Sequence, residues 1–192
     1  MNKHLPALLL SSVLALAALP AMGLELEGVK LEERIKLGGT ELQLNGAGVR
    51  SRAFFKGYVI GLYLPEKKGE AEAAIAAAGP KRIRVVPLRD LSADTVADAF
   101  SKSLRKNLSD EDQARMKPRL DEFHNAMLAL GPLRTGAVLE LDQVPGGGTR
   151  YRLNGEAKGK EIPGEDFYAA LMRIWIGKSP TQEDLKEKLL GR

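Results

Sequence analysis

The sequence predicts an α+β fold in which a large antiparallel sheet of six or seven strands is covered by helices on one side. Three observations carry this prediction. Short segments of alternating apolar and polar residues dominate the chain up to residue 88 and return after residue 137. The longer segments with helical spacing lie at residues 92–130 and after residue 165. Glycine-rich turns separate the strands, as is usual between antiparallel neighbours.

The first 23 residues are predicted to be a secretory signal peptide. A charged start at Lys3 precedes an apolar run over residues 5–19, and Ala21-Met22-Gly23 offers the small residues of a cleavage site. The run is too short and too rich in alanine to span a bilayer, which takes about 20 strongly apolar residues. We therefore expect one exported domain, residues 24–192, in the periplasm or outside the cell, without a transmembrane segment.

The N-terminal part of this domain reads as strands. Residues 24–27 and 42–45 alternate apolar and polar residues on either side of a turn at Gly38-Gly39. Two long strands follow, one running to about Arg52 and one over residues 56–64. An antiparallel hairpin is the simplest connection between them.

Two helical segments are expected in the middle of the chain, after a short alanine-rich helix over residues 70–78 and a strand over residues 82–88. Ser92 is a suitable N-cap for a helix ending near Asn107, because apolar residues recur at helical spacing and basic residues gather near its end.

Ser109 resembles a second N-cap, before an apolar stripe that runs from Leu120 to Leu130. Pro118 cannot donate a helical hydrogen bond, so we expect a short turn there followed by a longer helix. His124 lies beside the stripe and is predicted to be a residue of the helix surface or of its boundary with the core.

The C-terminal part is predicted to return to strands and then to end in two helices. The strands are expected over residues 137–143 and 149–153, joined by a hairpin turn at residues 145–148. One more tight turn is expected between Gly155 and Gly159. The first helix is expected over residues 165–177, and Thr181 is expected to cap the last helix.

Composition excludes several classes of function. The formal charge is only +4, and basic residues are interspersed with acidic ones, so no nucleic-acid partner is predicted. The most basic stretch, residues 81–89, is read as a strand with its charges on the wet face. The chain has no cysteine and two histidines, which excludes a thiol nucleophile, a zinc ribbon and a multi-histidine metal site. We predict no metal and no cofactor.

Arg50 and Tyr58 are the candidate ligand-binding residues, because each stands in a segment that otherwise reads as buried strand. A guanidinium matches a carboxylate with two parallel hydrogen bonds, and a tyrosine hydroxyl adds a neutral donor. Equal sequence parity is compatible with the two side chains facing the same side of the hairpin. The alternative is structural: Arg50 pairs with a nearby acid such as Glu41, and Tyr58 packs as an ordinary strand aromatic.

The order of motifs resembles the chalcone isomerase-like family in its bacterial exported form, over nearly all of residues 24–192. The matching motifs are Gly46-x-Gly48-x-Arg50, Tyr58-x-x-Gly61-Leu-Tyr-Leu64, Phe167, Ile174-Trp-Ile-Gly-x-x-Pro180, Leu185-Lys and Leu190-Gly. The resemblance implies an open-faced β-sandwich: a large antiparallel sheet, a layer of helices and a ligand cleft between them.

In the plant isomerases of this family, the motif arginine guides a phenolate in an intramolecular ring closure. A threonine on the next strand, a tyrosine, a lysine and an asparagine in a helical region, and a hydroxyl residue near the C-terminal helix assist it. The resemblance carries over only the arginine, as Arg50. The threonine position falls on Tyr58, the helical set around Asp90, Ala93 and Ala97, and the last hydroxyl near Ile174.

Because most assisting groups are replaced, no catalytic residue is predicted. The resemblance favours a non-catalytic binding protein for an apolar carboxylic acid such as a fatty acid, with Arg50 and Tyr58 on the carboxylate. An isomerase acting on an unsaturated phenolic ketone and a structural envelope protein remain the alternatives. Four helix residues could wall the pocket or belong to the ordinary core: Phe100, Leu104, Ile174 and Trp175.

Overall fold

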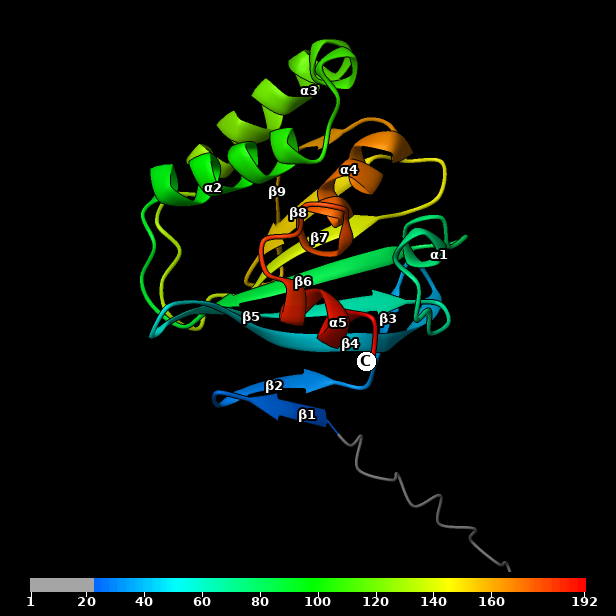
Figure 1. Cartoon of the computed structure of the whole chain (residues 1–192), viewed down its shortest axis with the longest axis vertical. Coiled ribbons are helices and arrows are strands. Elements are labelled where there is room, and N and C mark those ends of the chain that lie inside the picture. The colour runs from blue at the N-terminus through cyan, green and yellow to red at the C-terminus, as the bar shows by residue number, and fades with distance from the viewer. Residues whose placement is uncertain (1–22) are drawn as a thin grey trace, which may run out of the picture.

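Seven antiparallel strands form a curled sheet whose spatial order follows the chain from β3 to β9 (Figure 1). The computed structural model describes residues 23–192, so the predicted signal peptide lies outside the described residues except for Gly23. The strands are β1 (Gly23–Leu26), β2 (Val29–Glu32), β3 (Arg34–Leu37), β4 (Thr40–Arg52), β5 (Phe55–Leu64), β6 (Lys81–Pro87), β7 (Leu139–Gln143), β8 (Thr149–Leu153) and β9 (Glu156–Ile162).

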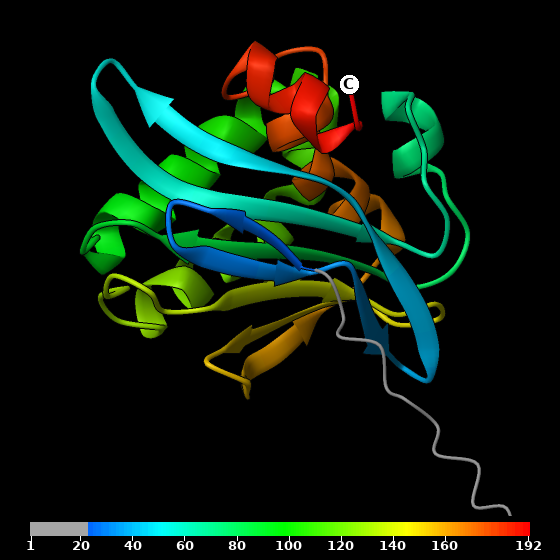
Figure 2. The same cartoon turned by 90° about the horizontal axis from the view of Figure 1, so that it is seen from below.

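The helices pack on one face of the sheet, which confirms the predicted α+β arrangement (Figure 1). They are α1 (Ala71–Ile75), α2 (Ala93–Lys106), α3 (Asp110–Ala129), α4 (Glu165–Ile176) and α5 (Glu183–Leu189). The small β1–β2 hairpin lies across the opposite face (Figure 2). None of the helices described between residues 23 and 192 has the length and apolarity needed to cross a bilayer.

Strand β5 shows how the sheet divides the two apolar clusters. Ile60 and Leu62 join the core beneath the helices, whereas Val59 and Tyr63 pack with Leu31 of the β1–β2 hairpin. Successive strand residues point to opposite faces, so this alternation gives β5 a buried side on each face. Tyr58 has the same parity as Ile60 and therefore belongs to the helix side.

Two β-bulges set the direction of Arg50. The β4–β5 register slips by one residue at Asn45 and slips back at Gly57, and between these bulges Arg50 lies directly opposite Tyr58. A one-residue shift moves every later side chain to the other face. Leu44 accordingly packs on the β1–β2 side, whereas Arg50 reaches the helix side, with the tyrosine.

Pro118 does not interrupt α3, so the predicted break is wrong. The ring is exposed on the outer side of the helix. Met116, Leu120 and Phe123 are buried on the inner side, and this packing outweighs the loss of one backbone hydrogen bond. His124 is half-buried on the same helix and shares a hydrogen bond of 3.0 Å with Ser101.

Three other expectations need correction. Strand β9 occupies most of the region read as a tight turn, because the turn itself takes only Asn154 and Gly155. The last helix is preceded by Gln182 rather than capped by Thr181. The basic side chains of β6 do not face water: Arg82 is only 8% exposed and forms a two-bond pair with Asp142, each bond 2.6 Å long, whereas Arg89, beyond the strand, is exposed. The neighbouring strand and the β1–β2 hairpin cover this face.

A candidate ligand cleft at the end of the sheet

A cleft of about 690 Å³ opens between the turn end of the β4–β5 hairpin and helix α2, which runs over this end of the sheet (Figure 1). Residues of β4, β5 and the end of β6 line one side, α2 lines the other, and the end of α4 with residues 179–181 closes the back. The volume lies within the range of about 300–1,000 Å³ that is typical of small-molecule sites.

Arg50 enters this cleft from β4. Its Nη1 donates to the carbonyl oxygen of Ser51 and, over 3.2 Å, to Oε1 of Gln182. Both acceptors are uncharged, and no carboxylate among residues 23–192 forms an ion pair with Arg50. Glu41, the structural alternative for its partner, pairs with Arg34 instead. The positive charge is therefore held in place but not neutralised by the described residues.

Gly46 and Gly48, which precede Arg50 on β4, explain how Gln182 comes within reach of Arg50. An added Cβ at Gly46 would stand 2.1 Å from the carbonyl oxygen of Lys188, and one at Gly48 would stand 2.6 Å from the Leu185 side chain. Only glycine allows the α5 backbone to approach β4 so closely. This approach places Gln182, just before α5, where it also accepts a 2.8 Å hydrogen bond from the Ser51 amide.

Tyr58 lies beside Arg50 and is fixed by Trp175, whose Nε1 donates to the tyrosine hydroxyl over 2.8 Å. Because the oxygen is the acceptor in that bond, its own proton remains able to donate. Burial raises the pKa of Tyr58, and the hydrogen bond from Trp175 and the charge of Arg50 oppose this effect only in part. The hydroxyl is therefore neutral at physiological pH and acts as a hydrogen-bond donor.

Thr181 is a cleft residue that the sequence reasoning missed by assigning it to a helix cap. Its hydroxyl oxygen is buried and has no hydrogen-bond partner among the described residues. It lies close enough to Tyr58 to lower the pKa of that hydroxyl slightly against the effect of burial. The only signal in the sequence is its place just after the Ile174–Pro180 motif.

The cleft is strongly biased towards positive charge. Among the described residues that line it, five are basic: Arg50, Arg52, Arg89, Lys102 and Lys106. The one carboxylate in the lining, Asp90, is already engaged by Arg134 over 2.7 Å and by the Thr135 backbone amide over 2.8 Å. Such a field attracts anionic ligands.

Apolar side chains form the inner walls. Phe100, Ile174 and Trp175 line the cleft, as the prediction allowed, and the rings of Phe100 and Trp175 meet edge to face with centroids 5.9 Å apart. Leu104 does not line it and belongs to the core beneath α2. The cleft thus combines a polar end at Arg50 with an apolar surface.

The positions assigned to the isomerases' helical set do not all reach the cleft. Asp90 lines it, but Ala97 is fully buried in the core and Ala93 is not part of the lining. The side of α2 that faces the cleft includes Thr95 and Lys102 instead. Ile174 contributes an apolar wall, and the nearby hydroxyl is that of Thr181.

A second hollow of about 790 Å³ lies between α2, α3 and α4. Its three carboxylates are all paired: Glu72 with Arg173 over 3.2 Å, Asp112 with Arg115 over 2.6 Å, and Asp166 with Arg115 over 2.9 Å and with the nearby Arg119 over 2.6 Å. The hydrogen bond from Arg119 is the largest of several effects that hold the pKa of Asp166 well below its usual value. The first cleft, with its unneutralised cation and apolar wall, is therefore the candidate site.

Comparison with solved structures finds the same fold in a fatty-acid binding protein of Arabidopsis thaliana, AtFAP1. The TM-score is 0.70 at 16% sequence identity, and the match covers 85% of this chain and 92% of the other. Comparison with curated proteins finds no significant match. The chalcone isomerase-like family model matches residues 23–191, which is almost the whole described chain. The protein therefore belongs to the chalcone isomerase-like family.

Proposed function

We propose that this protein binds an apolar carboxylic acid such as a fatty acid, in the periplasm, without catalysing a reaction. The observation that carries the proposal is the environment of Arg50. Its guanidinium has only neutral acceptors among the described residues and stands at the polar end of an apolar-walled cleft. A ligand carboxylate supplies the missing charge.

The carboxylate would accept hydrogen bonds from the remaining N–H groups of Arg50 and from the hydroxyls of Tyr58 and Thr181. A charge-assisted hydrogen bond contributes about 1.5–3 kcal/mol, more than a neutral one. The acyl chain would lie along Phe100 and Trp175 and gain stability by leaving water, at about 25 cal/mol per Å² of buried apolar surface. Head group and tail thus contribute independently.

Family and fold support this ligand class. The chalcone isomerase-like family includes both enzymes and non-catalytic fatty-acid binding proteins, and AtFAP1, which shares the fold, is named as a fatty-acid binding protein. The signal-peptide pattern of residues 1–23 supports export to the periplasm. N-terminal sequencing of the protein from expressing cells tests export: the first residue should be Leu24.

We infer the absence of catalysis because Arg50 is the only one of the isomerases' groups that the resemblance carries over. One positioned acid or base typically contributes about 10²–10⁴-fold to a rate. An arginine alone does not replace the missing threonine, tyrosine, lysine and asparagine of the isomerases. Chalcone added to the protein should cyclise at its uncatalysed rate. Turnover that disappears in Arg50→Ala would instead establish an isomerase.

Binding can be followed through Trp175, the single tryptophan of the chain. A brominated fatty acid in the cleft should quench its fluorescence. Arg50→Ala should weaken binding by about one to two orders of magnitude, and Tyr58→Phe by less. Arg50→Lys should recover only part of the loss, because an ammonium lacks the planar fork.

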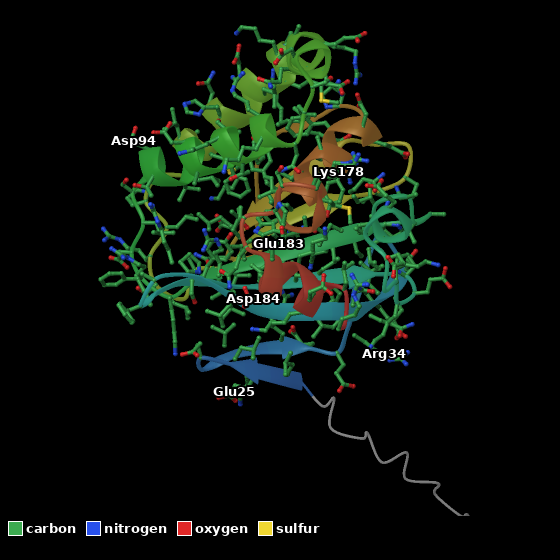
Figure 3. The ribbon with its side chains drawn as sticks, viewed as in Figure 1. Glu25, Arg34, Asp94, Lys178, Glu183 and Asp184 are labelled. Carbon is green, nitrogen blue, oxygen red and sulfur yellow. The ribbon has the colours of Figure 1, made fainter. Side chains whose placement is uncertain are left out.

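Arg34→Ala is the matched control, because it removes an arginine of the same sheet that lies away from the cleft (Figure 3). Its affinity should equal that of the wild type. Circular dichroism confirms the fold of each variant. Equal affinities in all five proteins would mean that Arg50 is structural and that the carboxylate site does not exist.

A further inference from the structure

The tip of the β4–β5 hairpin, residues 51–56, extends beyond the strands next to it. Pairing between β5 and β6 ends at Tyr58 and Pro87, and β3 pairs with β4 only up to Gln43. Residues 51–56 pair only within the hairpin, through Ser51 with Lys56 and Arg52 with Phe55. Figure 2 shows this end of the hairpin projecting past the rest of the sheet.

The tip is apolar where water would favour polar residues. Phe54 is 99% exposed and Phe55 is 68% exposed, the two most exposed large apolar side chains of the described residues. Tight hairpin turns usually use glycine, asparagine or aspartate at positive φ, but here Ala53 adopts a φ of 52°. The turn therefore presents three successive apolar residues to the solvent.

Basic residues surround this apolar tip. Arg52 and Lys56 flank it, and the guanidinium of Arg89 lies 6.0 Å from the ring centroid of Phe55. No Asp or Glu occurs between Glu41 and Glu66 in the sequence. Exposed aromatic rings within a basic rim complement the acyl boundary and the anionic headgroups of a bilayer.

Carboxylates near this end of the molecule are already paired or lie in the helix layer. Glu27 pairs with Lys56 over 2.7 Å, and Asp90 is held by Arg134. Asp94 stands at the start of α2, in the helix layer rather than in the sheet layer that carries the tip (Figure 3). No carboxylate among residues 23–192 forms an ion pair with the guanidinium of Arg52.

The tip also continues into the cleft, since Arg52 and Phe55 line its mouth and Arg50 lies two residues further along β4. We propose that residues 51–56 dock on the surface of an anionic lipid bilayer, with Phe54 inserted at the headgroup boundary. Docking places the mouth of the cleft against the membrane, so an amphiphile passes between bilayer and Arg50 without crossing water. The docking step does not depend on which ligand the cleft holds; the transfer step rests on the proposed function.

Sedimentation with vesicles tests the docking step, without added fatty acid. The protein used spans residues 24–192, because both apolar clusters and nearly every described element lie within this range, and the apolar N-terminal segment would bind lipid by itself. Wild type should sediment with vesicles of phosphatidylethanolamine and phosphatidylglycerol, and much less with phosphatidylcholine alone. High salt should weaken the binding.

Phe54→Ser should weaken binding to the anionic vesicles by about ten- to a hundredfold, the effect of removing one buried phenyl side chain. Arg52→Glu should weaken it by at least about tenfold, because it exchanges one attraction for one repulsion. Leu24→Ser, at an apolar side chain that is 41% exposed on β1, and Lys160→Glu, on β9, are the matched controls and should bind like the wild type.

A Phe54→Trp variant in a Trp175→Phe background reports insertion directly. Its emission should shift to the blue with anionic vesicles and should be quenched by lipids brominated near the headgroup. Transfer of a fluorescent fatty acid from vesicles to the protein should slow in Phe54→Ser, while its affinity in solution stays that of the wild type, since Phe54 is not part of the cleft lining.

The proposal is overturned if wild type and Phe54→Ser sediment equally with anionic vesicles, or if the wild type does not bind these vesicles. If the wild type does not bind vesicles but forms dimers, and Phe54→Ser does not form them, the tip is instead a contact with a second copy of the chain. If docking holds but no fatty acid binds in solution, the proposed function fails and the docking surface stands.

Discussion

The bulge at Asn45 can be tested by removing the side chain that holds it. Asn45 is only 4% exposed. Its Nδ2 donates to the carbonyl oxygens of Leu189 over 2.7 Å and Lys68 over 3.0 Å, and its Oδ1 accepts from the Lys68 amide over 2.6 Å. One side chain therefore joins the bulge, the loop before α1 and the end of α5.

Asn45→Ala removes three hydrogen bonds and leaves the buried Leu189 carbonyl and the partly buried Lys68 backbone groups without these partners. At about 1 ± 0.5 kcal/mol for each bond, the free energy of unfolding should fall by about 1.5–4.5 kcal/mol. Because α5 places Gln182 against Arg50, fatty-acid affinity should fall as well, although Asn45 does not line the cleft. The loss of affinity should be smaller than in Arg50→Ala.

Denaturant unfolding followed by circular dichroism gives the change in stability, and Trp175 quenching gives the affinity. Asn125→Ala is the matched control, since Asn125 is exposed on α3 and its side chain makes no hydrogen bond with the described residues; its stability should stay within about 0.5 kcal/mol of the wild type. A midpoint and slope for Asn45→Ala equal to those of the wild type would refute the role given to the bulge.

Three further changes test other parts of the fold. Gly46→Ala should lower stability by about 1–3 kcal/mol, because its Cβ would stand 2.1 Å from an α5 carbonyl oxygen, whereas Gly69→Ala, with 3.9 Å of room, should be nearly neutral in denaturant unfolding. Asp142→Ala removes the two-bond partner of the buried Arg82 and leaves it with Glu140 alone, so it should cost about 1.5–3 kcal/mol. Arg82→Met with Asp142→Leu should recover most of this loss, since Glu140 keeps its pair with Arg84 over 2.9 Å. The Thr135 amide and Arg134 lower the pKa of Asp90 from 3.8 to about 2. A carboxyl group whose pKa is lower in the folded state stabilises the fold at pH values above its unfolded pKa. The stabilisation by Asp90 should therefore be lost as the pH falls from 3.8 to about 2. Thermal melts over that range should show a shallower acid dependence for Asp90→Asn.

The fold could be read from the sequence because its signals are local. Alternation with a period of two predicted the long hairpin, and the serines at 92 and 109 cap their helices, each accepting a hydrogen bond from the third residue ahead. The errors concern effects of distant packing. The break expected at Pro118 does not occur, because the inner face of α3 is buried against other elements.

The candidate site was only partly predictable for a related reason. Residues 50 and 58 have equal parity, but the two-residue turn at Ala53-Phe54 would place them on opposite faces without the bulge at Gly57. A bulge leaves little trace in a single sequence. The Thr181 hydroxyl was missed because its place in the cleft depends on α5 packing against β4, a contact between segments more than a hundred residues apart.

The central claim is that the charge of Arg50 selects a carboxylate, and a comparison of one fatty acid with its methyl ester tests it most directly. The ester keeps the acyl chain and loses the charge. In the wild type the acid should bind about one to two orders of magnitude more tightly than the ester, and in Arg50→Ala the two affinities should be nearly equal. The same preference for the acid in folded Arg50→Ala, or no preference in the wild type, would contradict the account.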